Sequence, residues 1–200
     1  QAAKNDRRDA DQDFGCNPCS EIILRPYQFC NLSEVVIRES DTMDTLKEKV
    51  GLATILGTFQ ATLTDFKYLR KIWKDNTEEE RLLGVSLTGI MDNAMTSTAG
   101  NKLPILLGIL KDEAIRINKA MAEVLDIPQA TAVTCVKPSG TVSQLTDAAS
   151  GIHARHNPYY VRTVRGDNKD PLTQFLVSQG IPADSDVVKP DSTTVFSFPM

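Results

Sequence analysis

The chain has 200 residues, a formal net charge of −4 at pH 7, 41% hydrophobic and 24% charged residues, values typical of a folded globular domain. This charge excludes a general basic field that would attract nucleic acid, and no apolar run is long enough to cross a bilayer. The polar residues 1–13 form neither a signal peptide nor a transit peptide. We therefore expect a cytoplasmic protein with no nucleic-acid or membrane partner.

Both ends of the sequence suggest that more chain belongs to this protein. The sequence begins with Gln1 rather than Met, and residues 193–200 (TTVFSFPM) have the β-branched and aromatic composition of a strand, which needs a neighbour to pair with. We expect the chain to be a piece of a larger protein, incomplete at both ends.

The first elements follow from breakers and hydrophobic periodicity. Gly and Pro predict an ordered loop over residues 14–30, and alternating polarity predicts a strand over 31–38. A long helix is predicted from a cap at Asp41 or Thr42 to about Trp73.

A capping box of Thr77 and Glu80 then predicts a helix that ends at about Met91. The alternation of strands with long helices predicts an α/β architecture. The remaining predicted elements are helices over 103–125, 142–149 and 171–179, and strands over 131–136, 159–164 and 193–200.

Three of the four cysteines lie in the predicted loop. In a cytosolic chain such cysteines are more often catalytic or metal-binding than disulfide-bonded. Asn17, Cys19 and Glu21 occupy alternate positions, which in an extended segment point to the same side. An amide, a thiol and a carboxylate would then face a hydroxylated substrate together. Cys135, in a predicted buried strand, is interpreted as a core thiol.

A zinc site is the alternative interpretation of these cysteines. Cys16, Cys19 and Cys30, with His153 or His156, would supply the four ligands that structural zinc needs. The intervals are irregular and no second Cys-x-x-Cys pair is present, so no metal site is assigned.

A second candidate site lies between the predicted strand 131–136 and the helix that follows it. Ser139, Gly140 and Thr141 combine two hydroxyls with a glycine at a helix start, where backbone N–H groups and the helix dipole favour anions. The Gly-Lys-Ser/Thr ending of a Walker loop is missing. An ordinary strand-to-helix turn is the alternative.

Two segments carry a resemblance to a known family. Residues 14–22 (FGCNPCSEI) resemble the active-site loop of ribonucleotide reductases, and residues 137–144 (KPSGTVSQ) resemble the segment with which that family holds substrate phosphates. Pro18 and the short interval from Cys19 to Cys30 look most like the adenosylcobalamin-dependent class. The resemblance implies that residues 1–200 are part of the ten-stranded α/β barrel of these enzymes, with a cysteine finger loop.

The resemblance also implies roles for the candidate residues. Cys19 would become a thiyl radical that abstracts the 3′ hydrogen of the ribose, Glu21 would take the proton of the 3′ hydroxyl, and Asn17 would hold the hydroxyls. Cys30 would reduce the substrate and form a disulfide with a cysteine that precedes Gln1. Ser139, Gly140 and Thr141 would hold the phosphates.

The implied activity is radical reduction of ribonucleoside tri- or diphosphates to 2′-deoxyribonucleotides for DNA synthesis. Adenosylcobalamin would be the cofactor, nucleotides the allosteric effectors, and thioredoxin or a similar protein the reductant. The alternatives are the large subunit of a diiron-dependent reductase, a truncated reductase without turnover, and a cysteine-based zinc module.

Overall fold

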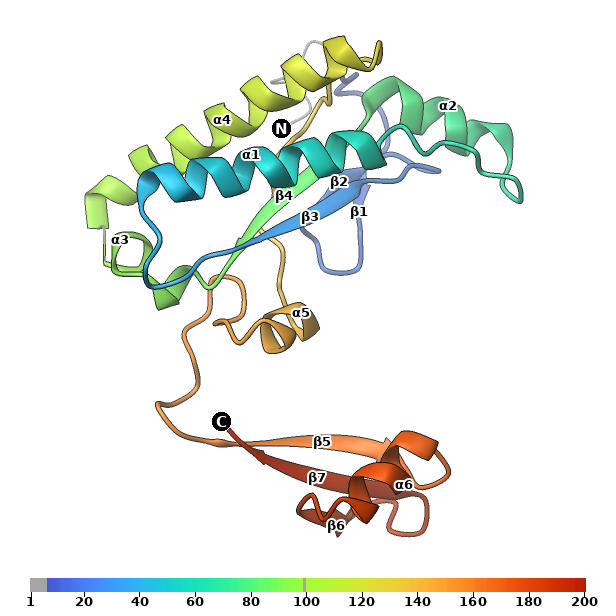
Figure 1. Ribbon diagram of the computed structural model, residues 1–200. Helices are drawn as coiled ribbons and strands as arrows, with labels where there is room; N and C mark the ends of the chain where they lie inside the picture. The colour runs from blue at the N-terminus through green and yellow to red at the C-terminus, as the bar shows by residue number, and fades with distance from the viewer. Residues whose placement is uncertain (1–6, 99) are drawn as a thin grey trace. The chain divides into compact units, whose positions relative to one another are not determined.

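The computed structural model describes residues 7–98 and 100–200 of the chain (Figure 1). Two compact units make up the chain, Gln1–Ala154 and Arg155–Met200. Among the described helices, none is both long enough and apolar enough to cross a membrane.

A parallel strand pair forms the centre of the first unit. Strand β3 (Asn31–Val36) pairs with β4 (Leu83–Thr88), and the register runs from Asn31 opposite Leu83 to Val36 opposite Thr88. On its other side β4 meets the segment 131–136 through a parallel bridge between Val85 and Thr134. Because it has neighbours on both sides, β4 is buried along nearly its whole length. The strand predicted over 131–136 is reduced to this bridge.

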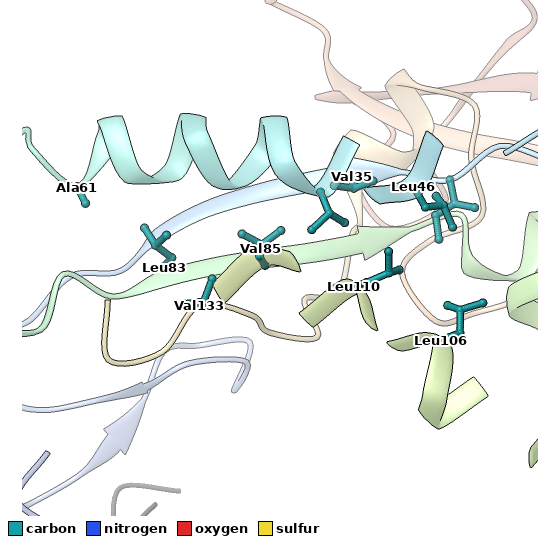
Figure 2. Packing of buried hydrophobic residues seen from close by; sticks show 11 residues of the cluster. Val35, Leu46, Ala61, Leu83, Val85, Leu106, Leu110 and Val133 are labelled. Carbon is teal, nitrogen blue, oxygen red and sulfur yellow. The ribbon is translucent and has the colours of Figure 1, made fainter. Parts of the chain in front are cut away.

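Two long helices cover one face of this pair, α1 (Met43–Gln60) and α4 (Leu103–Val124) (Figure 1). Asn118 of α4 donates to the Thr58 hydroxyl of α1 at 3.1 Å, so a polar contact joins the helices inside the core. Aliphatic side chains fill the space between helices and strands (Figure 2): Val35, Ile37, Leu46, Val50, Ala61, Leu83, Val85, Leu106, Leu110, Ala114 and Val133.

Helix α1 starts where the sequence predicts and ends earlier. The Thr42 hydroxyl accepts the Thr45 N–H as an N-cap. The predicted continuation to Trp73 is wrong, because the helix ends at Gln60. Beyond it the backbone changes to a tighter pattern, in which the Thr62 N–H donates to the Phe59 carbonyl and the Leu63 N–H to the Gln60 carbonyl, each at 3.0 Å.

The capping box predicted at Thr77 and Glu80 is also wrong. Both residues lie buried near the end of α2 (Lys71–Glu80), which stops at Arg81 in the left-handed conformation with φ 47°. The residues predicted to continue as a helix to Met91 form β4 and the short η2 (Ile90–Asp92).

The helix predicted over 142–149 is shorter in the structure, and that over 103–125 is confirmed. The short elements of the first unit are α3 (Ala94–Ser97), η3 (Gly100–Lys102) and α5 (Thr141–Leu145).

The second unit is a three-stranded antiparallel sheet with one helix. Strand β7 (Thr193–Pro199) lies between β5 (Val161–Asp167) and β6 (Ala183–Ser185), so it has partners on both sides within this chain. Helix α6 (Pro171–Ser178) starts with Asp170 accepting the Leu172 N–H at 2.8 Å. The predicted helix and both predicted strands of this region are confirmed.

Candidate active site

The cysteine loop is the tip of a small hairpin. Strand β1 (Gly15–Cys16) pairs antiparallel with β2 (Ile23–Leu24), and six residues connect them. Asn17 closes this loop, because its side-chain oxygen accepts the Ile22 N–H at 3.0 Å and its own N–H donates to the Ile22 carbonyl at 3.3 Å. Ser20 has φ 62°, so the chain turns sharply after Cys19.

This turn changes the geometry expected from the sequence. The segment is not extended, so alternate side chains do not share one side. Cys19 is exposed at the loop, whereas the side chain of Glu21 is fully buried. The loop thus presents the thiol to the outside and turns the carboxylate inward.

An ion pair holds the Glu21 carboxylate. The Lys137 ammonium donates to Glu21 Oε1 at 2.9 Å, across 116 residues of sequence. Burial alone would raise the pKa of Glu21, but hydrogen bonds from Lys137, from its own backbone and from the Asn17 amide, with the Lys137 charge, bring the pKa below its usual 4.5. Glu21 is therefore ionised at neutral pH.

In the part of the chain that the structure describes, the second carboxylate oxygen of Glu21, Oε2, lacks a partner comparable to Lys137. Oε2 is buried and makes no hydrogen bond of regular geometry with any residue that the structure describes. A buried acceptor without a donor is costly, and such groups in folded proteins commonly mark a functional position. Oε2 is therefore the Glu21 oxygen that the ion pair leaves without a regular donor among the described residues.

Two half-buried thiols lie around this carboxylate. Burial, and then the Glu21 charge, raises the pKa of Cys30. Burial raises the pKa of Cys135 to about 11, and the Glu21 charge and Cys30 add to the effect. Cys135 Sγ would lie 3.1 Å from a Cβ added at Gly84, so the absent side chain of this β4 glycine gives the thiol its space. Both thiols are protonated at neutral pH.

Sequence reasoning singled out neither Lys137 nor Cys135 as a site residue. The signal for Lys137 was its position at the start of the segment 137–144, which resembles a phosphate-holding segment. The pairing with Glu21 has no local signature, since it depends on the tertiary fold. Cys135 had no signal beyond its place in an apolar run, where a core thiol is the ordinary interpretation.

A buried polar network anchors the hairpin from behind. Arg25, directly after β2, pairs with Glu80 at 3.3 Å and with Glu79 at 3.0 Å. Arg8 pairs with Glu80 at 2.9 Å and donates to the carbonyl of Ile23 at 3.0 Å. These bonds fix the base of the hairpin to the end of α2, so the loop stands on a rigid support.

The Lys137–Glu21 ion pair also links the cysteine loop to the segment 137–144, which contains the candidate phosphate-binding residues. Ser139 is buried, and within the described chain its hydroxyl makes no hydrogen bond, while its carbonyl accepts from the hydroxyls of Ser143, at 2.8 Å, and Ser150. Space is open around the Gly140 Cα, and Thr141 begins α5. Lys137, which binds Glu21, lies two residues before Ser139 in the chain.

The zinc alternative receives no support from the geometry. Across residues 7–98 and 100–200, no three His, Cys, Asp or Glu side chains form a group that could hold a metal ion. His156 instead contacts the ring of Tyr160 edge-on.

Comparison with solved structures defines the class of fold. The chain resembles a B12-dependent, class II ribonucleotide reductase with a TM-score of 0.73 and 24% identity, over 92% of this chain and 29% of that one. No family model matches the chain.

Comparison with curated protein sequences finds relatives of higher sequence identity than the solved structure. The chain is similar to adenosylcobalamin-dependent ribonucleoside-triphosphate reductases: it is 30% identical to that of Euglena gracilis over 94% of its length and 27% identical to that of Lactobacillus delbrueckii subsp. bulgaricus over 93%. It spans 25% and 28% of those relatives, respectively. The resemblance predicted from the cysteine loop is confirmed.

Proposed function

We propose that this chain forms the part of an adenosylcobalamin-dependent ribonucleotide reductase that carries the radical cysteine and the general base. As part of a longer enzyme, it would serve the reduction of ribonucleoside tri- or diphosphates to 2′-deoxyribonucleotides. One observation carries the proposal: the loop turns the Cys19 thiol outward while it holds the Glu21 carboxylate buried, ionised and with one oxygen unpartnered.

The proposed fold context is a segment of the ten-stranded α/β barrel, with the hairpin loop as its cysteine finger and residues 1–200 as a partial barrel domain. The parallel β3–β4 pair under two helices, with the class II likeness, supports this context. The cytoplasmic location predicted from the sequence belongs to the same proposal.

The loop residues divide the proposed chemistry between them. The Cys19 thiyl radical would take the 3′ hydrogen atom of the ribose, and Glu21 Oε2 would accept the proton of the 3′ hydroxyl. The Asn17 oxygen already accepts the Ile22 N–H and its NH₂ group also donates to Glu21, so Asn17 would act on the sugar through the second N–H of that group. Although the thiol is exposed and the carboxylate buried, the Lys137 ammonium feels the charge of both Cys19 and Glu21, so the two groups would be near enough to act on one sugar, and the braced loop would hold them there before the substrate arrives.

Cys30 would serve as a reductant of the substrate. Its raised pKa keeps the S–H bond intact at neutral pH, which a hydrogen donor requires. Its disulfide partner would come from a segment before Gln1, and thioredoxin or a similar protein would restore the thiols. Ser139, Gly140 and Thr141 would hold the phosphates, and nucleotides would bind elsewhere as effectors.

The exposed thiol of Cys19 fits a radical-generating group that approaches from outside the hairpin. When bound, adenosylcobalamin supplies the radical that oxidises such a thiol. The described residues with a place in this step are Cys19, which presents the sulfur, and Asn17, which fixes the loop.

The test is tritium exchange between 5′-labelled adenosylcobalamin and solvent in the full-length enzyme with an effector nucleotide present. Wild type should exchange, Cys19→Ser should not, and Cys16→Ser, which removes an exposed thiol of the same hairpin, should retain exchange. Active enzyme without exchange would contradict the cobalamin assignment and favour a diiron partner subunit. Exchange that persists in Cys19→Ser would contradict the role of Cys19.

A further inference from the structure

The Lys137–Glu21 pair joins the two parts of the site. The Lys137 side chain is 29% exposed and that of Glu21 is fully buried, so the pair is shielded on the carboxylate side. A bond between groups shielded in this way is stronger than a surface pair of the same length.

The backbone of Lys137 is also fixed. Its N–H donates to the hydroxyl of Ser86 at 3.0 Å, and Ser86 is a fully buried residue of β4. The Lys137 carbonyl lies against Gly151, where an added Cβ would be 3.1 Å away. Gly151 has φ 54°, so a side chain there would be disfavoured on both counts. The ammonium is thus carried by a main chain that is held at the sheet edge.

We propose that Lys137 is a positioning residue for the general base: it binds Oε1 of Glu21 and thereby leaves Oε2 as the oxygen that takes the substrate proton. This inference rests on the proposed function, because the proton that Glu21 would accept is that of the ribose 3′ hydroxyl. It adds Lys137 as the residue that orients the Glu21 carboxylate and keeps it ionised inside the fold.

The groups around Glu21 support this assignment. Lys137 is the cation whose charge lowers the pKa of Glu21. The other titratable groups near this ion pair are three thiols: Cys19 on the loop, Cys30 just before β3 and Cys135 beside β4. The three thiols cannot stabilise a buried carboxylate by charge, because a thiolate would repel it. Removal of the Lys137 charge should leave burial as the dominant influence, which raises the pKa of Glu21.

The first experiment measures the Glu21 carboxyl directly, by ¹³C NMR titration of the 200-residue chain. Lys137→Met should raise the Glu21 pKa, and Lys137→Arg should keep it low. Lys49→Met is the matched control, because Lys49 pairs with Asp41, whose side chain is also buried, at 2.6 Å in the same unit. It should leave the Glu21 titration unchanged. An unchanged Glu21 pKa in Lys137→Met would overturn the proposal.

A second variant keeps the test decisive if Lys137→Met does not fold. Glu21→Gln removes the charge and retains the shape, and the ¹⁵N signal of the Lys137 ammonium reports the other half of the pair. The pKa of Lys137, raised chiefly by its hydrogen bond to Glu21, should fall in this variant. A Lys137 pKa that does not move would likewise overturn the proposal.

The functional experiment uses the full-length enzyme. Lys137→Met should lower kcat by on the order of 10²-fold with a much smaller change in KM, because the base is misplaced and partly protonated. The acidic limb of its pH profile should move to higher pH, and Lys137→Arg should restore most of the rate. A loss confined to KM would instead make Lys137 a substrate-binding residue and refute the positioning role.

The two experiments separate the inference from the function on which it rests. If the Glu21 pKa responds to Lys137 while the wild-type enzyme reduces no ribonucleotide, the proposed function fails and the ion-pair assignment holds. If reductase activity is present and Glu21 ignores Lys137, the proposed function holds and the inference fails.

Discussion

Arg8 and Glu80 form an ion pair of 2.9 Å in which both side chains are buried, at 5% and 2% exposure. Gln28 donates to the same Glu80 oxygen at 2.6 Å. One carboxylate therefore joins the segment before the hairpin, the segment after it and the end of α2. The cysteine loop projects from a base that this carboxylate holds together.

Glu80→Ala should lower the free energy of unfolding by about 3–5 kcal/mol, because it leaves Arg8 buried without its partner. Urea denaturation of the chain measures this loss. The control is Glu113→Ala, which removes a surface pair with Arg116 on α4 and should cost about 0.2–1 kcal/mol. Equal losses in the two variants would show that burial does not strengthen the Glu80 network.

Gly84→Ala should destabilise the first unit by about 1–3 kcal/mol, because the new methyl group would lie 2.5 Å from Leu32, 3.0 Å from Ile22 and 3.1 Å from Cys135. Gly108→Ala, in the interior of α4 with open space around it, should stabilise the helix by about 0.5–1 kcal/mol. Thermal unfolding of both variants checks the opposite signs. A neutral Gly84→Ala would mean that β4 and Cys135 have room that the structure does not show.

Asp41 should make stability depend on pH in the acid range. Burial raises its pKa, but hydrogen bonds from Lys49, the Arg38 backbone and Thr45 outweigh this and bring the pKa below its usual 3.8. A carboxyl with a depressed folded pKa stabilises the fold above its unfolded pKa and loses that contribution as pH falls through the folded value.

The stability of wild type relative to Asp41→Asn should accordingly be greatest above about pH 5 and shrink at lower pH. Urea titrations at several pH values measure this difference. Asp44→Asn, a change at an exposed residue in the first turn of α1, should differ from wild type by within about 0.5 kcal/mol. A difference for Asp41→Asn that grows on acidification would contradict the assignment.

The four cysteines should separate into two reactivity groups. With a pKa of about 11, Cys135 is ionised in roughly one molecule in 10³ at pH 8, and burial protects Cys30 in the same way. Iodoacetamide followed by mass spectrometry should therefore label the exposed Cys16 and Cys19 well before the other two. Prior labelling of Cys135 would show that its site is open to solvent and its thiol ionised.

The sequence predicted the elements that depend on local signals. Helix α4 has a long apolar periodicity, and the Thr42 cap is a local hydrogen bond, so these features could be predicted from sequence. Strand β4 could not, because the capping pattern at Thr77 and Glu80 competed with it and its burial comes from neighbours distant in sequence. Tertiary contacts therefore determine that this segment is a strand, which its local sequence pattern does not indicate.

The same division applies to the site. Asn17, Cys19 and Glu21 lie within five residues, so their joint presence was visible as a motif. Their directions were not, because the left-handed Ser20 sends the thiol and the carboxylate to different environments. The contact between Lys137 and Glu21 could not be predicted from the sequence, because only the folded chain brings the two residues together.

The Lys137–Glu21 bond also sets an order of assembly. A growing polypeptide contains Cys19 and Glu21 long before residue 137 has been synthesised, and during that interval the Glu21 carboxylate lacks its ion-pair partner. This ion pair can therefore form only after the ribosome has added more than a hundred further residues. Nascent or truncated chains would contain Cys19 and Glu21 without the bond that ties Glu21 to Lys137.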